Sequence, residues 1–200
     1  MTESWGLGAI FSSSINGHIL VGMERNAEKK VTRYNKEGRK LQGIQWGDQG
    51  QSLYQRIDYI TENINGDICS SDSSAGRVVV VTASGEYRFS YYGLHRFSYS
   101  GRHSQSRFCP FGICTDVLGQ ILICNYSDVH LLDINGQFLS FLLVKDQCPK
   151  SSCGLCIDDE HNFWIGASDS STVSVYKYLK KTKQYFIYGI HRFESQPLLA

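Results

Sequence analysis

The chain has 200 residues, of which 42% are apolar and 20% charged, a composition that excludes a disordered or fibrous chain and fits one folded domain. Twenty basic and nineteen acidic residues leave a formal net charge of +1, so no overall field favours nucleic acid or acidic membranes. No apolar run approaches the roughly 18–20 residues of a membrane span, and the first residues do not resemble a secretory signal, so we expect no membrane contact.

A polar turn followed by a short apolar strand recurs along the chain. The turns are marked, in order, by Gly17, Gly66, Gly119 and Asn162. A second turn follows each of the first three at a similar distance in the sequence. These second turns end at Gly38, Gly85 and Gly136. Repeats of roughly 40–50 residues that each contain several strands are typical of β-propeller blades.

Each repeat predicts four strands, because β-branched and aromatic residues alternate with turns in which glycine supplies a positive φ. The expected strands are residues 7–12, 18–23, 30–34 and 39–45, then 57–62, 67–72, 77–82 and 87–92, then 111–115, 120–125, 129–133 and 138–144, and last 154–157, 163–166, 172–178 and 184–188. No segment carries a convincing apolar period of 3.6 residues, so we expect under about a tenth of the chain in helix.

We therefore predict an all-β fold, a single propeller region in which each repeat forms one antiparallel sheet. The expected blades are residues 7–45, 57–92, 111–144 and 154–188, followed by a tail at 189–200. The core should come from alternating strand positions that face neighbouring blades. These positions are Ile19, Val21, Ile68, Val79, Val81, Ile121, Ile123, Leu131, Leu155 and Trp164.

Five segments carry a family resemblance. They are SSSINGHILVGM, YITENINGDICSSDSSAGRVVVV, GICTDVLGQILICN, HLLDINGQFLSFLL and GLCIDDEHNFWIG with the following VSVYKY, and together they extend over about residues 8–178. Each stands at the same place within its repeat, and as a set they resemble the NHL-repeat β-propeller of tripartite-motif (TRIM) proteins. The resemblance implies a six-bladed ring that selects the protein or RNA targets of a ubiquitin ligase.

The chain departs from that family in having four repeats instead of six. We therefore expect an open arc, whose first and last blades do not pair and whose exposed edge strands allow self-association. The sequence also lacks the Cys/His ladder of a RING or B-box and the heptads of a coiled coil. This chain alone is accordingly expected to bind a protein target, to need no cofactor and not to be an enzyme.

Residues 87–115 contain no acidic residue and interleave arginines with aromatic side chains, and we expect residues 87–107 to protrude as an extended connection between the second and third blades. The candidate partner-binding or RNA-binding residues are Arg88, Tyr91, Arg96, Phe97, Tyr99 and Arg102. Such a surface could stack single-stranded RNA bases and pair with phosphates. The simpler interpretation is a strand whose aromatic side chains alternate between core and solvent and whose arginines are solvated.

A further pattern of acidic residues concerns metal binding. Asp116, Asp158 and Asp159 follow predicted strands, and with His18 or His161 they would suit a metal-dependent propeller hydrolase or lyase. Hydrogen bonding within tight turns explains these aspartates more simply.

The chain has seven cysteines, an odd number that, without a signal sequence, favours reduced thiols and a cytoplasmic location. Cys148, Cys153 and Cys156 have a zinc-like spacing but no fourth ligand at a familiar distance, so we interpret them as ordinary thiols.

Overall fold

The computed structural model describes residues 4–94, 107–126, 128–144, 147–149, 152–168, 172–181, 186–192 and 196–197. Every regular element within these ranges is a β-strand. Among these described residues there is no helix with the length and apolar character needed to cross a membrane.

The strands form four antiparallel sheets, each built from strands that are consecutive in the chain. The first sheet contains β1 (Gly6–Ser12), β2 (Ile19–Arg25), β3 (Glu28–Tyr34) and β4 (Lys40–Ile44), and the second β5 (Tyr59–Glu62), β6 (Ile68–Asp72), β7 (Arg77–Val81) and β8 (Tyr87–Tyr91). The third contains β9 (Pro110–Thr115), β10 (Ile121–Asn125), β11 (Asp128–Leu132) and β12 (Phe138–Leu143). The fourth contains β13 (Ser152–Ile157), β14 (Asn162–Ala167), β15 (Thr172–Lys181) and β16 (Phe186–Arg192), with β17 (Gln196–Pro197) paired to β15.

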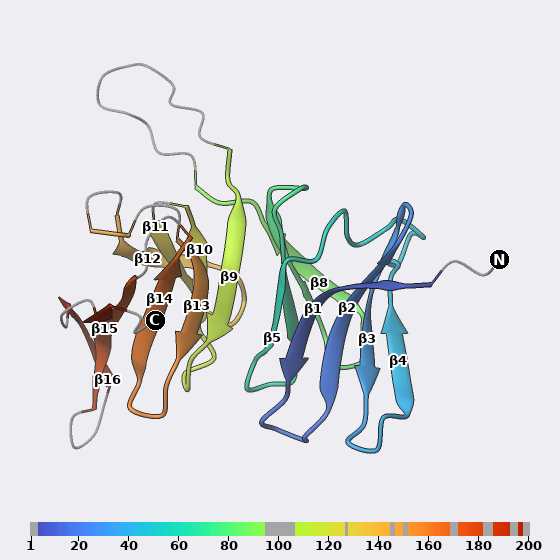
Figure 1. The fold of residues 1–200 in the computed structure, drawn as a ribbon, viewed down its shortest axis with the longest axis horizontal. Coiled ribbons are helices and arrows are strands. Elements are labelled where there is room, and N and C mark those ends of the chain that lie inside the picture. The colour runs from blue at the N-terminus through green and yellow to red at the C-terminus, as the bar shows by residue number, and fades with distance from the viewer. Residues whose placement is uncertain are drawn as a thin grey trace.

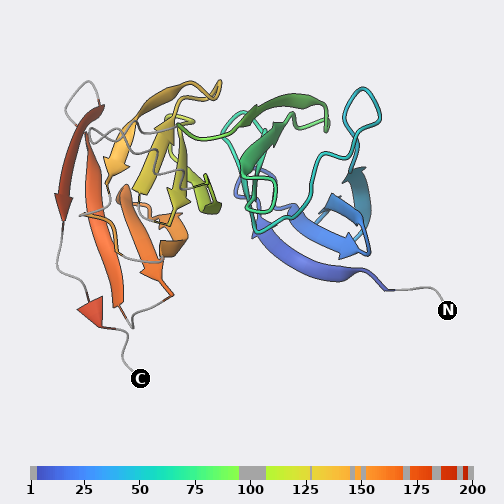
Figure 2. The same ribbon diagram turned by 90° about the horizontal axis from the view of Figure 1, so that it is seen from above.

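The sheets follow one another around an arc, as the views in Figures 1 and 2 show. Consecutive sheets touch through their first strands, β1 with β5, β5 with β9 and β9 with β13. The first and fourth sheets share no strand pairing among the described residues. The predictions of four antiparallel sheets, very little helix and an open arc are confirmed, and each predicted strand overlaps an observed one.

The core lies between the sheets, so a sheet with two neighbours is buried on both faces. In β7 the four consecutive valines 78–81 are all buried. Val79 and Val81 pack in a cluster with the first sheet, whereas Val78 and Val80 pack with residues of the third. Because successive side chains of a strand point to opposite faces, a strand between two sheets needs an unbroken apolar run.

Most of the predicted core positions are confirmed. Val21, Ile68, Val79, Val81, Ile121, Ile123 and Leu131 are buried, whereas Ile19 and Leu155 are half-buried. The prediction for Trp164 is wrong, because this side chain is 37% exposed and its indole N–H donates to Asp158. Trp164 lies on the face of the fourth sheet that points away from the third, and its neighbour Phe163 is the buried residue.

Gly136, in the turn between β11 and β12, gives a first testable prediction. Its φ is 82°, and a Cβ atom there would collide with the ring of Phe89. Gly38 has a similar φ of 77° but open space around the Cβ position. We expect Gly38→Ala to cost about 1 kcal/mol, from backbone strain alone. Gly136→Ala should cost about 1–3 kcal/mol more, because the Phe89 ring must also move.

Chemical denaturation of the two variants measures this difference. Equal losses of stability would contradict the packing of Phe89 against the third sheet.

Candidate functional site

The turns that join the first and second strands of the four sheets, called here the first turns, all lie at the lower end of the molecule in Figure 1. Each begins with a residue whose side-chain oxygen accepts backbone N–H bonds within the turn. Asp116 Oδ1 accepts from Leu118 at 2.9 Å and from Gln120 at 2.8 Å. Ser13, Asn63 and Asp158 play the same part in the other turns. These bonds satisfy the backbone of each turn locally.

The side chains at the tips of the first three turns are therefore free to face solvent, and they are apolar. They are Ile15, Ile64, Val117 and Leu118, which are between 39% and 56% exposed. We call these four residues the turn rim. In the fourth turn the corresponding positions hold Asp159 and Glu160, so one end of the rim is acidic.

The turns of the rim touch one another. Asn63 Nδ2 donates to the carbonyl oxygen of Gly119 at 2.8 Å, which joins the second and third turns. The Ile64 side chain lies against Gly119, so its apolar surface meets that of the third turn. Ser13 donates to the carboxylate of Glu62, the last residue of β5, which joins the first turn to the second sheet.

Turn chemistry does not require these apolar side chains. Tight turns favour glycine, proline, asparagine, aspartate and serine, and a single exposed apolar residue needs no explanation. Here apolar residues stand at the tips of three consecutive turns, of which the second and third are in contact. Exposed apolar patches with polar margins are typical of protein contact sites.

Asp116 and Asp158, which begin the third and fourth of these turns, have different electrostatic environments. Burial raises the pKa of Asp116, although Tyr178 donates a 3.0 Å hydrogen bond to it. Partial burial alone would raise the pKa of Asp158 too. There, hydrogen bonds from Trp164, Asn162 and backbone N–H groups outweigh that effect, and the net pKa is lowered. Both aspartates are thus held as turn residues, as the simpler interpretation of the sequence predicted.

Two of the predicted partner-binding residues are engaged inside the protein. Arg88 forms an ion pair with Asp67 and donates to Asn135 Oδ1 at 3.1 Å, which ties the second sheet to the third. Tyr91 is 8% exposed, and its hydroxyl lies 2.8 Å from Nδ1 of His130. The prediction that Tyr91 is a surface residue is therefore wrong. The packing of the third sheet, which the sequence does not reveal, covers it.

The other four residues of that prediction, Arg96, Phe97, Tyr99 and Arg102, lie outside the described residues. The same is true of most of the predicted protruding connection, which therefore stays a prediction.

The described residues contain no group of three or more His, Cys, Asp or Glu side chains placed to hold a metal ion. Cys148 packs in the core between the third and fourth sheets, whereas Cys156 is exposed.

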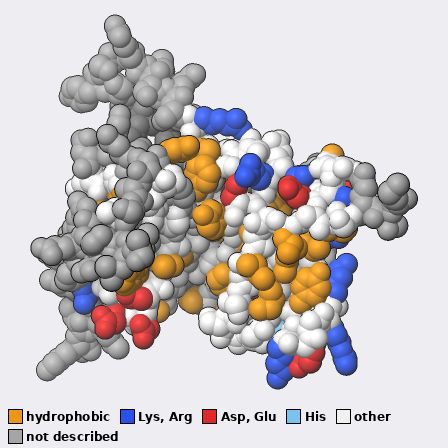
Figure 3. Space-filling view, in the orientation of Figure 1, with side chains coloured by type: hydrophobic (Ala, Val, Ile, Leu, Met, Phe, Trp, Pro, Cys, Tyr) orange, Lys and Arg blue, Asp and Glu red, His pale blue; other side chains and the backbone are white. Residues whose placement is uncertain are grey.

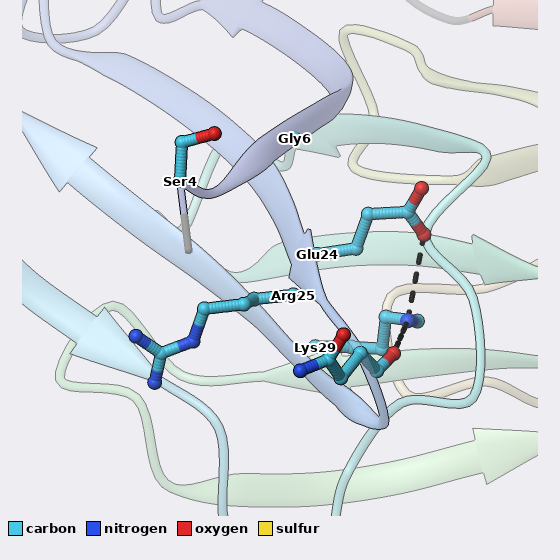
Figure 4. Close-up of a pocket in the computed structure, with 6 residues that line it drawn as sticks. Ser4, Gly6, Glu24, Arg25 and Lys29 are labelled. Atoms are coloured by element: carbon cyan, nitrogen blue, oxygen red, sulfur yellow. Dashed lines mark hydrogen bonds and ion pairs between the residues drawn. The ribbon is translucent and has the colours of Figure 1, made fainter. Parts of the chain in front are cut away.

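A shallow pocket lies between the start of β1 and the turn joining β2 to β3, and Figure 4 shows the residues that line it. Lys29 Nζ lies 3.5 Å from the Glu24 carboxylate and 2.7 Å from the Asn26 carbonyl oxygen (Figure 4). Arg25 pairs with Glu28 at 2.8 Å. The positive charges of the pocket are therefore engaged within the protein, and the turn rim is the stronger candidate site.

The sequence patterns used above did not single out the turn rim, although a signal for it is present. In SINGH, NINGD and DVLGQ an apolar residue stands among turn-forming residues, at a position where the turn conformation does not require one. Comparing the tips of equivalent turns would have identified these side chains.

No family model matches the sequence, and no curated protein matches it. Solved structures do match the fold. A virginiamycin B lyase from Staphylococcus aureus is 13% identical with a TM-score of 0.62, and the match covers 96% of this chain and 57% of that one. The WD40 repeats of RRP9 are 14% identical with a TM-score of 0.66, covering 88% and 49%.

A putative 6-phosphogluconolactonase from Bacteroides uniformis is 10% identical with a TM-score of 0.65, covering 94% of this chain and 56% of that one. The chain thus spans about half the length of the propellers that it matches. Such low identities establish the architecture alone. The chain has the fold of a β-propeller, with four blades arranged as an open arc.

Proposed function

We propose that this chain is a protein-recognition module and that the turn rim contacts the partner. The observation that carries this proposal is the recurrence of exposed apolar side chains at the tips of three neighbouring turns. These turns are fastened by short local hydrogen bonds, so the surface is formed before binding and little order must be gained on contact. A partner that presents apolar side chains would complement it.

The resemblance of the repeats to the NHL propeller of TRIM proteins supports a finer proposal, that the partner is a substrate of a ubiquitin ligase. In this proposal the chain contributes recognition and no catalysis. The odd number of cysteines supports a cytoplasmic location. The engagement of Arg88 and Tyr91 inside the fold weakens the alternative of an RNA surface built from the arginine-rich segment.

The double variant Ile64→Asp/Leu118→Asp tests the function. Both side chains are exposed, so the fold should be kept, while the desolvation cost of two carboxylates should oppose apolar contact. Proteins are captured from nuclease-treated extract with the tagged chain, purified, and titrated against the unchanged chain and the double variant. We expect them to bind the double variant at least about tenfold more weakly, because central apolar contacts often contribute above 2 kcal/mol.

Leu139→Asp is the matched control, because Leu139 is an exposed apolar residue of β12 outside the turn rim. A partner that binds the double variant and the unchanged chain equally would overturn the proposal. Capture that disappears on nuclease treatment and weakens steeply with salt would assign the chain to RNA instead.

A further inference from the structure

The outward faces of the first and fourth sheets, at the two ends of the arc, correspond to faces that are buried wherever two sheets meet. Ile60 of β5 and Ile113 of β9 each pair with the third residue of the neighbouring strand, and each is buried against the preceding sheet. Ile10 of β1 has the same register position, pairing with Val21, the third residue of β2. No described sheet precedes the first one, and Ile10 is 74% exposed.

The fourth sheet shows the complementary pattern on its opposite face. Leu20 and Leu122, each on the second strand of its sheet, are fully buried by the sheet that follows. Trp164 has the equivalent position on β14, pairing with β13 on one side and β15 on the other. No described sheet follows the fourth, which explains the exposure of Trp164.

The junction between the first and second sheets shows how two such faces interlock. Gly22 lies two residues after Leu20, and a Cβ atom there would lie 2.7 Å from Cγ2 of Ile57. Ile57 therefore fills a gap that only glycine leaves open. On the fourth sheet, Gly166 lies two residues after Trp164, and no atom of the described residues lies within 4 Å of its Cβ position.

The residue that would fill this second gap is also present in the chain. Leu7 stands three residues before Ile10, as Ile57 stands three residues before Ile60, and Leu7 is 75% exposed. The open face of the first sheet thus carries the projection, and the open face of the fourth carries the gap. One copy cannot bring them together, because they stand at opposite ends of its arc (Figure 2).

We propose that two copies of this chain close into one ring, with the fourth sheet of each copy packed face to face on the first sheet of the other. Leu7 of one copy then occupies the space over Gly166 of its partner, and Trp164 is covered. A two-fold axis along the centre of the ring makes the two junctions identical, so the assembly is closed.

The charges and dimensions of the arc fit this arrangement. The open face of the first sheet carries Lys30 and Lys40, whereas Asp159 and Glu160 stand at the edge of the fourth. Figure 3 shows apolar side chains over β1–β4, basic groups at the right margin and acidic groups at the lower left. The solved propellers are about twice as long as the part of them that this chain matches, so two arcs together have about the length of one ring.

Sedimentation equilibrium of the purified chain over a wide dilution series tests the proposal. We expect a species of twice the chain mass that does not grow further with concentration. Leu7→Asp and Gly166→Trp each alter one face, and both positions are open in the single copy, so the fold should survive. Each variant alone should lose the dimer, while Leu139→Asp should keep it. Circular dichroism and the unfolding temperature check that the variants are folded.

Mixing the two variants provides the decisive measurement. An unaltered Leu7 from one variant meets an unaltered Gly166 from the other, so one junction of the two is complete and dimer mass should return. A monomer at all concentrations would overturn the proposal, as would a dimer that both substitutions leave intact, which would indicate pairing of edge strands. Masses that continue to rise beyond two copies would show that the junction forms without closing and would equally contradict the ring.

Discussion

Replacing Glu62 by leucine should lower the free energy of unfolding by about 3–5 kcal/mol. The Glu62 carboxylate lies 2.7 Å from Nη1 of Arg33, and the two side chains are only 1% and 7% exposed. Nε and Nη2 of Arg33 are buried with no hydrogen-bond partner among the described residues. Glu62 therefore supplies the main compensation for a buried cation, and its removal leaves that charge unpaired between the first and second sheets.

Denaturant unfolding followed by tryptophan fluorescence measures this loss, and a double variant separates its causes. Arg33→Met together with Glu62→Leu should recover more than half of the lost stability, because an apolar pair of similar volume no longer needs charge compensation. Glu37→Leu removes one member of the exposed Lys36–Glu37 pair and should change stability by less than about 0.5 kcal/mol. A double variant as unstable as Glu62→Leu would show that shape, and not charge, holds this junction.

The second large effect is expected for Ile68→Ala, at about 2–5 kcal/mol. Ile68 is fully buried on β6, in the cluster between the first two sheets, and its truncation leaves a cavity between sheets that cannot easily approach each other. Thermal or chemical unfolding at a fixed protein concentration measures the loss.

Ile64→Ala is the matched control for Ile68→Ala, because the same side chain is shortened four residues earlier at an exposed site of the turn rim. We expect a loss of less than about 1 kcal/mol for Ile64→Ala, together with weaker binding of the protein partner. If both substitutions cost the same, the register of the second sheet is wrong.

The turn rim and the ring closure are compatible with each other. All first turns lie at one end of the arc, and a two-fold axis along the ring keeps that end common to both copies (Figure 1). The rims of two copies would then lie on the same end of one ring, which would present two equivalent sites to a partner. Each site lies on one chain, so the binding variants at Ile64 and Leu118 and the closure variants at Leu7 and Gly166 report on separate properties.

The positions of the strands and turns were determined by the sequence itself, because their signals are local. Four-residue turns such as that ending at Gly66 need a positive φ, which glycine supplies, and the observed φ there is 83°. Runs such as RVVVV suit an extended backbone whichever sheet covers them. The repetition of these signals in one order was enough to predict four antiparallel sheets. The open arc was predicted because the chain has four repeats where the family that it resembles has six.

Only the tertiary structure decided which face of each strand is covered, because that depends on contacts between residues far apart in the chain. Tyr91 is buried by His130 of the next sheet, and Arg88 is engaged by Asn135. Trp164 has an apolar side chain at a strand position that other sheets bury, yet no described sheet follows it. Local propensity is the same for a covered and an uncovered strand, so the neighbouring sheet alone determines whether such a residue is core or surface.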